Sequence, residues 1–330
     1  MVRKYSALRR VLLFLLIVSF MITVTSCRVF RRPTTPQDGG AMPPIPSKIA
    51  RGDRLEPNIR VYLHETGQIQ TMGFEEYLLG VVAAEMEPTW PAEALAAQAI
   101  VARAFTLDKI ARQGGVPGRN ADASTDIQEF QAYDASRIND NVRQAVQRTR
   151  GTVLAFQGEF VRTWFSAYCD GMTSTAEDGL AFREFPTPFI TRVTDICPER
   201  TPENVQGYTV TFTKSEVTQA MQQAGQNTGS FSQIDVVNRD QAGRAVSVRI
   251  GQATVSGPAF RIAIGSTRLR STKWDSVTVT GDRVTFVGSG YGHGVGMCQW
   301  GARARAEQGN SFEQIVKGFF PNTQLGKIWD

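Results

Sequence analysis

The carboxyl group of Glu85 is the strongest candidate for chemistry in this 330-residue chain, because it follows the apolar run VVAA in the segment FEEYLLGVVAAEM. A carboxyl group among apolar neighbours loses hydration, so its pKa rises and it can donate a proton near neutral pH. The next helical segment adds two polar groups, Gln98 and Arg103, within an otherwise apolar run. An inward-pointing amide such as that of Gln98 needs hydrogen-bond partners. The alternative for Glu85 is a structural ion pair with Arg103.

The second candidate is the segment GYGHGVGMCQWGARARAEQG, residues 290–309, which contains His293, one of only two histidines in the chain. Glycines recur at every second position from 288 to 296. Such alternation bares one face of a strand, or permits φ angles that other residues avoid. Something therefore comes close to this backbone, either a ligand or another protein segment such as the alanine-rich helix around Gln98. The other histidine, His64, receives no role.

Several functional classes are excluded by spacing and charge. The glycines do not form the G-x-G-x-x-G loop of dinucleotide-binding proteins, and neither HExxH nor GxSxG occurs. Two histidines make a Ser-His-Asp triad or a histidine-rich metal site improbable. The formal charge of +5 includes four basic residues of the N-terminal leader, and the rest of the chain holds 32 basic against 31 acidic residues. We therefore expect no nucleic-acid partner.

The N-terminus predicts export from the cytoplasm. The charged stretch MVRKYSALRR precedes the apolar stretch VLLFLLIVSFMITV, which is too short to span a membrane and is typical of a secretory leader. The leader ends at VTSC, which resembles a lipobox, with cleavage before Cys27 and lipid attached to its thiol. We expect a signal peptide over 1–26, a disordered Pro- and Gly-rich tether over 27–57 and a catalytic domain over 58–330. The protein would then lie in the cell envelope, anchored to a membrane through its N-terminal lipid. An ordinary secretory leader is the alternative.

The elements that must position these residues mix helices with mostly antiparallel strands. Because the elements show no βαβ rhythm, we predict an α+β fold in one large domain. Strands are expected at 58–72 as a hairpin, at 152–156 and 160–168 as a second hairpin, and at 208–213, 233–240, 245–251, 275–280 and 283–288. Helices are expected at 74–86, 91–115, 140–151, 214–224, 257–265, 297–308 and from Ser311 onward.

The block YLLGVVAAEMEPTWPAEALAAQAIVARAFTL resembles the opening block of the stage II sporulation protein D family, which also includes the amidase enhancers of bacterial autolysis. Further blocks follow in family order, namely TDIQEFQAYD, AVQRTRGTVLAFQGEFVRTWFSAYCDGMTS, SGPAFRIAIGSTRLRST and GSGYGHGVGMCQWGARARAEQGNSFEQIVKGFFPNTQL. The resemblance covers roughly residues 58 to 328.

The resemblance implies a lytic transglycosylase that cleaves the glycan strands of peptidoglycan, preferring strands stripped of stem peptides. Glu85 occupies the position of the catalytic glutamate. The positions that would contact substrate or orient the acid are Gln98, Arg103, Gly292, His293 and Gln299, with Gly294 and Gly296 in the same loop. The C6 hydroxyl of N-acetylmuramic acid would attack, and the product would carry a 1,6-anhydro end.

The cysteines leave two alternatives open. If Cys27 carries lipid, three remain, Cys169, Cys197 and Cys298. Some members of the resembled family bind zinc near the segment WFSAYCDGMTS, but here Ser166 occupies the expected histidine position. Cys169 and Cys197 would supply two ligands where zinc generally needs three or four. A disulfide between them would close a loop of about 28 residues and contribute roughly 3–4 kcal/mol. The chemistry proposed for Glu85 requires no cofactor.

A second function is carried forward as the alternative. Because the family contains amidase enhancers, the chain could be a non-catalytic glycan-binding activator of a cell-wall amidase. The presence of Glu85, Gln98, Arg103 and His293 favours the enzyme. Under either hypothesis the partners are peptidoglycan glycan strands and, for the activator, an amidase.

Overall fold

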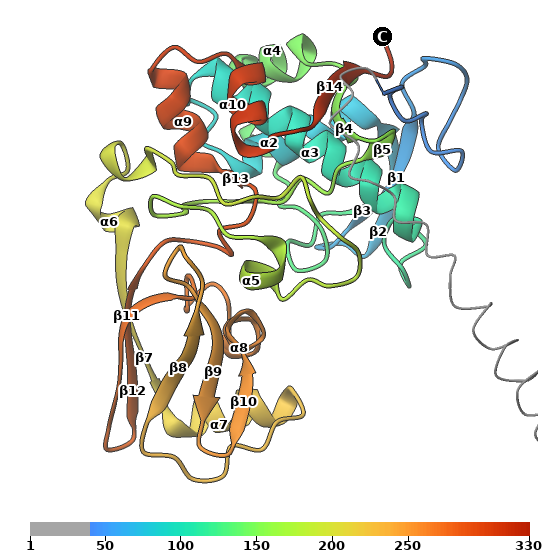
Figure 1. The fold of residues 1–330 in the computed structure, drawn as a ribbon. Coiled ribbons are helices and arrows are strands. Elements are labelled where there is room, and N and C mark those ends of the chain that lie inside the picture. Colours follow the sequence, from blue (N-terminus) through green and yellow to red (C-terminus); the bar gives the residue numbers. More distant parts are fainter. Residues whose placement is uncertain (1–39) are drawn as a thin grey trace, which may run out of the picture. The chain divides into compact units, whose positions relative to one another are not determined.

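The computed structural model describes residues 40–330, in which helices and mostly antiparallel strands are mixed, as Figure 1 shows. The predicted α+β class is confirmed. The expected signal peptide, Cys27 and the first part of the expected tether lie outside the described residues. Across residues 40–330, no helix combines the length and the apolar character needed to cross a bilayer.

The folded part begins before residue 58. Ile49 is 6% exposed and belongs to the first hydrophobic core. Lys48 forms an ion pair with Asp122 at 2.6 Å, and Glu56 accepts a hydrogen bond from the backbone N–H of Glu75 at 2.9 Å. The expected disordered tether is thus corrected for residues 40–57, because their few apolar side chains find places on the domain despite the Pro- and Gly-rich composition.

The predicted N-terminal hairpin leads into the helix that ends at the candidate acid. Strands β1 (Asn58–Leu63) and β2 (Gln68–Gly73) pair antiparallel, and the short β3 (Ala123–Ser124) adds to β1 in parallel. Helix α2 (Phe74–Glu85) follows directly. Its apolar residues from Phe74 to Ala83 are mostly buried in the first core, which fixes where its last residue lies.

Helix α3 (Ala92–Gln113) lies at the centre of the first core, as Figure 1 shows. Every residue from 94 to 108 is buried, and α2, α4, α9 and α10 all pack against it. The many alanines allow these neighbours to come close, and an all-round apolar helix is expected to be buried. The helix ends at Gly114, whose φ of 70° is the left-handed conformation of a helix C-cap.

The remaining elements of the first core come from the middle of the chain and from its C-terminal end. Strand β4 pairs with β5 and with the C-terminal β14, all antiparallel. Ser311 caps the last helix in a capping box with Gln314, as predicted. These elements are α4 (Asp140–Arg148), β4 (Thr152–Phe156), β5 (Glu159–Phe160), α9 (Gln299–Glu307), α10 (Phe312–Phe319) and β14 (Gln324–Lys327).

The predicted long strand over 160–168 is wrong. Within this segment, only Phe160 of β5 takes part in the pairing with β4, and the chain then leaves that sheet. Strand β6 (Phe165–Ser166) instead pairs in parallel with β13 (Met297–Cys298). The segment is held by the glycine-rich region, because Met297 donates a backbone hydrogen bond to the carbonyl of Trp164 at 3.0 Å.

A second hydrophobic core lies between two antiparallel three-stranded sheets and two helices. The sheets have the orders β11-β12-β7 and β10-β9-β8. Their strands and helices confirm the predicted elements of this region and form a core around Phe212, Phe260, Trp274 and Phe286. They are β7 (Gly207–Thr213), α7 (Lys214–Gln223), β8 (Ile234–Arg239), β9 (Ala245–Ile250), β10 (Ala253–Ser256), α8 (Gly257–Ile264), β11 (Lys273–Thr280) and β12 (Arg283–Ser289).

An irregular stretch over residues 169–206 connects the two cores. It contains only the short elements α5 (Ala176–Leu180), η2 (Cys197–Glu199) and α6 (Glu203–Gln206), while η1 (Ala135–Arg137) precedes α4. Lys273 of β11 pairs with Asp170 at 2.6 Å, and the Ser174 hydroxyl donates to Asp240. These contacts hold the second core against the loops that surround the candidate site.

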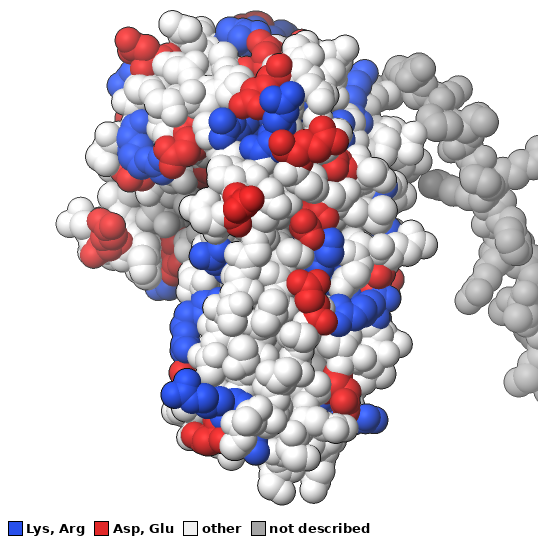
Figure 2. Space-filling model, turned by 90° about the vertical axis from the view of Figure 1, so that its left-hand side faces the viewer, with Lys and Arg blue, Asp and Glu red and all other residues white. Residues whose placement is uncertain are grey.

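Charged side chains of both signs are interspersed on the surface. On the face that Figure 2 views, basic and acidic side chains lie next to one another rather than in a single-sign field. Ion pairs such as Arg112 with Glu159 and Arg303 with Glu307 likewise place opposite charges next to one another. The view agrees with the near-balanced charge from which no polyanionic partner was expected.

Candidate active site

Glu85 is the last residue of α2, where the helix reaches a cavity. Its Oε1 accepts a hydrogen bond from the backbone N–H of Ala132 at 2.8 Å. Its Oε2 accepts from the side-chain amide of Gln299 at 3.4 Å. Both donors come from distant parts of the chain, so the fold itself completes the surroundings of this carboxyl.

Burial raises the pKa of Glu85 to about 7, while the hydrogen bonds from Ala132 and Gln299 act in the opposite direction. Ala84, Phe105 and Phe130 line the cavity together with Glu85, and the C-terminal end of a helix disfavours negative charge. A carboxyl group with this pKa is protonated in about half of the molecules at neutral pH. It can therefore act as a proton donor and, once ionised, as a proton acceptor.

Gln98 and Gln299 form a pair of amides behind the carboxyl group. The Gln299 amide donates to Oε1 of Gln98 at 3.4 Å, as well as to Glu85. Gln98 is fully buried on α3, and its amide nitrogen has no hydrogen-bond partner among the described residues. Gln98 thus orients Gln299, which in turn contacts the acid.

His293 lies on the glycine-rich loop and carries no charge at neutral pH. Burial lowers its pKa to about 3, aided by the positive charges of Arg261 and Arg244, and opposed by a hydrogen bond with the Phe165 backbone. Its Nδ1 accepts the backbone N–H of Val295 at 3.0 Å. The proton of the neutral ring is therefore assigned to Nε2, which makes this nitrogen a hydrogen-bond donor.

A cavity of about 540 Å³ brings four of the predicted site residues together: Glu85, Gly292, His293 and Gln299. Among the described residues that line it, Glu85 is the only carboxylic acid. Its walls carry many aromatic rings, which suit the apolar faces of sugars. These rings belong to Phe105, Phe130, Trp164, Phe165 and Tyr291.

Arg103 does not belong to this cavity, which corrects the expectation that it contacts substrate or pairs with Glu85. Its guanidinium is 0% exposed and binds Glu75 through two bonds of 3.0 and 2.6 Å. It also donates to the carbonyl of Thr152 at 2.9 Å, and Trp329 donates to Glu75 at 2.8 Å. Arg103 points to the opposite end of α2, so its role is to stabilise the core.

The glycine-rich segment comes close to other parts of the protein. Gly294 has φ 75°, and a Cβ there would overlap the Arg244 guanidinium. Gly296 has φ 73°, and a Cβ there would overlap the carbonyl of Trp164. Of the two alternatives, protein packing accounts for these glycines, although the partners are Arg244 and the segment at 164 rather than α3. Gly292 lines the cavity itself.

Cys169 and Cys197 meet as the sequence hypothesis requires, with their Sγ atoms 3.3 Å apart. Cys298 joins them, and all three are free thiols in the structure. The side chain of Asp195 lies at the same point. Neither Cys298 nor Asp195 was assigned to this cluster from the sequence.

Three further residues at the site were missed by the sequence analysis. Ala132 supplies a backbone donor, for which side-chain patterns give no signal. Arg244 is fully buried and donates to the carbonyl oxygens of Cys169 and Gly292 at 3.1 and 3.3 Å. Arg261 of α8 lines the cavity, within the block SGPAFRIAIGSTRLRST that had already been quoted.

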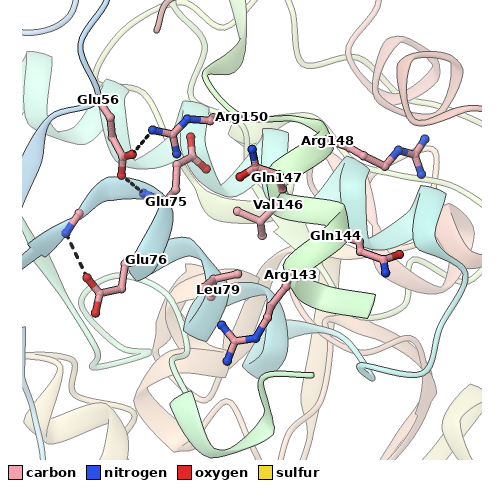
Figure 3. Close-up of a pocket in the computed structure, with 11 residues that line it drawn as sticks. Glu56, Glu75, Glu76, Leu79, Arg143, Gln144, Val146, Gln147, Arg148 and Arg150 are labelled. Carbon is pink, nitrogen blue, oxygen red and sulfur yellow. Dashed lines mark hydrogen bonds and ion pairs between the residues drawn. The ribbon is translucent and has the colours of Figure 1, made fainter. Parts of the chain in front are cut away.

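A second hollow of about 750 Å³ lies between α2 and α4, away from Glu85. Figure 3 shows that Glu56 and Arg150, which both line it, point toward one another and form an ion pair. Glu75 binds Arg103, and Glu76 accepts the N–H of Gly73 at 3.4 Å. Its carboxylates are thus engaged within the protein, and this hollow offers no proton donor comparable with Glu85.

Comparison with known proteins shows a family that part of the chain resembles. Residues 62–156 match the stage II sporulation protein family. This region runs from β1 to β4 and includes Glu85, Gln98 and Ala132. This part of the chain is thus similar to the domain that the family model describes.

Full-length relatives extend this match. The chain is 28% identical over 296 residues to stage II sporulation protein D of Bacillus subtilis, covering 85% of this chain and 82% of that protein. It is 27% identical over 302 residues to the amidase enhancer of the same organism, covering 75% of this chain and 40% of that protein. An uncharacterised protein of Brachyspira hyodysenteriae is 29% identical over 260 residues, or 78% of this chain and 67% of that protein. The resemblance read from the sequence motifs is confirmed.

Proposed function

We propose that this protein is a lytic transglycosylase of peptidoglycan, with Glu85 acting first as general acid and then as general base. Kinship with stage II sporulation protein D and with an amidase enhancer supports a role in the cell wall, outside the cytoplasm. The finer statement of the reaction rests on the cavity.

The observation that carries the proposal is a single carboxylic acid of raised pKa in a sugar-sized cavity. Glycoside hydrolases generally use two carboxyl groups, of which one protonates the leaving oxygen and the other attacks or activates water. Among the described lining residues, Glu85 has no carboxylate partner for a second role. A reaction in which the substrate supplies its own nucleophile removes the need for one.

The steps balance with this one group. Protonated Glu85 gives its proton to the oxygen that bridges C1 of N-acetylmuramic acid and the next sugar, and the C1–O bond breaks. The C6 hydroxyl of the same N-acetylmuramic acid forms a new bond to C1. Ionised Glu85 accepts the C6 hydroxyl proton and returns to its starting state. No water is consumed, and the product carries a 1,6-anhydro end.

The neighbours of Glu85 suit both of its states. The N–H of Ala132 and the amide of Gln299 stabilise the carboxylate that forms after the first proton transfer. Neutral His293 lines the same cavity, and its hydrogen bonds with the backbone of Val295 and Phe165 hold the ring in place. Because the ring is neutral, it adds no positive charge to the developing oxocarbenium ion.

Arg261 supports a preference for glycan strands that have lost their stem peptides. Removal of a stem peptide leaves a free carboxylate on the lactyl group of N-acetylmuramic acid. The Nε of Arg261 is held by the carbonyl oxygens of Leu269 and Arg270, and its Nη2 by that of Ser266. These bonds fix the guanidinium in the cavity wall and leave Nη1 as a donor for such a carboxylate.

The second candidate is a glycan-binding activator of a cell-wall amidase. It is favoured by the 27% identity to a protein named amidase enhancer, although the chain covers only 40% of that protein. In this case the cavity would bind glycan without cleaving it, and Glu85 would serve as a hydrogen-bonding group.

Glu85→Gln separates the two candidates. The amide keeps the shape and the hydrogen-bonding capacity of the side chain but cannot deliver a proton at a useful rate. We expect cleavage of denuded glycan to fall at least a thousandfold, while glycan binding in a pull-down assay stays within a fewfold of wild type. Glu87→Gln, two residues away at an exposed position, is the matched control. Full activity in Glu85→Gln would remove this residue from the mechanism, and the absence of cleavage by the wild type would favour the activator.

A further inference from the structure

The segment over residues 130–134 carries the backbone donor of the acid but forms no helix or strand of its own. It belongs to the sequence block TDIQEFQAYD, and none of the side chains in this block takes part in the proposed proton transfers. The N–H of Ala132 lies 2.8 Å from Oε1 of Glu85. Because loops are more mobile than helices and strands, other contacts must fix the donor at this distance.

The first of these contacts binds the side chain of Gln131 to α3. Gln131 is 2% exposed, and its Nε2 donates to the hydroxyl of Thr106 at 2.9 Å. That hydroxyl donates in turn to the carbonyl of Ala102, one turn earlier, at 2.9 Å. Thr106 is fully buried, so water does not compete for the bond. The hydrogen bond between Gln131 and Thr106 is called the α3 anchor below.

The second contact lies on the other side of Ala132, where the segment meets Gly80 of α2. The N–H of Asp134 donates to the Gly80 carbonyl at 3.0 Å. The ring of Tyr133 covers Gly80 so closely that a Cβ there would overlap it, and this ring stacks on that of Tyr77. Glycine is unfavourable inside a helix, so the close approach of Tyr133 accounts for its presence. The contacts of Gly80 with Tyr133 and Asp134 are called the α2 anchor below.

The two anchors flank the donor directly. Ala132 is preceded by Gln131 and followed by Tyr133, so the backbone between the anchors has little freedom to turn its N–H away. Gly80 belongs to the same helix as Glu85, which ties the hydrogen-bond donor and acceptor to one rigid element. The anchors therefore fix the distance between the N–H and the carboxyl group.

We propose that the α2 anchor and the α3 anchor are positioning contacts, which hold the Ala132 N–H against Glu85 while the acid loses and regains its proton. This inference deepens the proposed lytic transglycosylase function, and its effect on catalysis rests on that function. The N–H stabilises the ionised carboxyl group, in opposition to burial. Without it, Glu85 would remain protonated to higher pH and would give up its proton less readily.

The other titratable side chains around the acid stay in place in the variants below. Arg261, His293 and Tyr291 share its cavity. Burial raises the pKa of Tyr77, which lies on the same helix as the acid, so this phenol stays neutral near pH 7. A changed titration of Glu85 therefore reports on its hydrogen bond from the loop rather than on a new neighbouring charge.

Thr106→Val tests the α3 anchor. Valine keeps the shape of threonine but removes the hydroxyl that accepts the hydrogen bond from Gln131. We expect the pKa of Glu85 to rise by about one unit, the effect of losing a hydrogen bond to a charged group. Carbon NMR of the side-chain carboxyl groups in the full chain measures this pKa, with the signal assigned by Glu85→Gln. The alkaline limb of the pH profile of kcat/KM should move up by the same amount.

Two further variants separate positioning from a general loss of stability. Thr106→Ser keeps the hydroxyl, so Glu85 should titrate as in the wild type. Thr149→Val is the matched control, because the Thr149 hydroxyl is also fully buried and donates to the carbonyl one turn earlier, that of Ala145. This control can lower stability but should leave the titration of Glu85 unchanged. Equal titration curves for Thr106→Val and the wild type, or equal shifts for Thr106→Val and Thr106→Ser, would overturn the α3 anchor.

Gly80→Ala tests the α2 anchor. The added methyl group meets the ring of Tyr133 and should displace the segment, so the pKa of Glu85 should rise as in Thr106→Val. An unchanged titration in Gly80→Ala would overturn this anchor.

A measurement on the wild type covers the case in which a variant fails to fold. The amide proton of Ala132 donates to Glu85, so its chemical shift should change with pH with a midpoint of about 7. An Ala132 amide proton that does not titrate would overturn the whole inference. These titrations need no substrate, so a wild type that does not cleave glycan would overturn the proposed function alone.

Discussion

The raised pKa of Glu85 has a consequence for stability that is independent of any substrate. Its pKa rises from 4.5 in an ordinary environment to about 7 in the folded protein, because burial disfavours the charged form. The folded state therefore holds this proton more tightly than the unfolded state. The stabilising effect is fully present below pH 4.5 and is lost as the pH rises through 7. Glu85→Gln removes this dependence, since an amide does not ionise in this range.

The magnitude follows from the same shift. If the whole shift is realised, ionisation of Glu85 lowers the free energy of unfolding by about 2.5 kcal/mol more at pH 8 than at pH 5. If water in the cavity halves the shift, the difference is about 1 kcal/mol. Relative to wild type, Glu85→Gln should thus gain about 1–2.5 kcal/mol in stability between these pH values.

Urea unfolding at pH 5, 6, 7 and 8, followed by tryptophan fluorescence, measures this difference directly. Glu87→Gln is the matched control, because Glu87 is exposed and forms only a surface pair with Arg137. Its stability should follow that of wild type at every pH. If the curves of Glu85→Gln and wild type also ran parallel, the carboxyl group would have an ordinary pKa, and its assignment as general acid would fail.

The other predictions concern the neighbours of the acid and the buried ion pair. Gln299→Leu removes a hydrogen-bond donor to the Glu85 carboxylate, so the pKa of Glu85 should rise. Because such a hydrogen bond is worth somewhat under 1 kcal/mol, the alkaline limb of the pH profile of kcat/KM should move up by about half a pH unit. An unchanged limb would show that Gln299 does not act on Glu85. Arg103→Met should destabilise the protein by about 3–5 kcal/mol in thermal or urea unfolding, because it leaves the Glu75 carboxylate buried and unpaired. A Glu75→Gln change in the same chain should restore part of this loss, and an Arg103→Met protein of normal stability would contradict the assigned role. In competition assays, Arg261→Met should lower the preference for denuded over peptide-bearing glycan by about tenfold, because it removes one charge-assisted hydrogen bond. An unchanged preference would exclude a contact between Arg261 and the lactyl carboxylate.

Elements with strong local signals were predictable from the sequence. Helix α3 has a long apolar run, a proline before its first turn and Gly114 after its last, and its bounds agree with the expectation. Helix α10 has a capping box and an amphipathic pattern, and it begins where predicted. The strands of the second core showed a similarly clear alternation of apolar and polar residues.

Features that depend on long-range pairing were not predictable. The segment 160–168 alternates like a strand, yet its partner is β13, more than 130 residues later, rather than β4. The tether was placed by composition, which does not show that Ile49 finds a place in the core. In both cases the deciding contact lies outside the window in which sequence patterns operate.

The candidate site was predictable only in part, because some of its contacts join segments that are distant in the sequence. Glu85, Gly292, His293 and Gln299 were placed by motif resemblance, and all four line one cavity. Arg103 was misplaced, because the helical period shows that a residue is buried but not which carboxylate it meets. Cys298 and Asp195 reach the thiol cluster from distant segments, so spacing along the chain could not assign them.

The central claim is that one carboxyl group suffices because the substrate supplies the nucleophile. The most direct test is mass spectrometry of the products released from denuded glycan strands by the full chain, with Glu85→Gln as the inactive control. We predict products that end in 1,6-anhydro-N-acetylmuramic acid, lighter by one water than the products of hydrolysis. Products with ordinary reducing ends, made by the wild type and absent with Glu85→Gln, would contradict the account. They would require a water nucleophile and a base that the cavity around Glu85 does not supply.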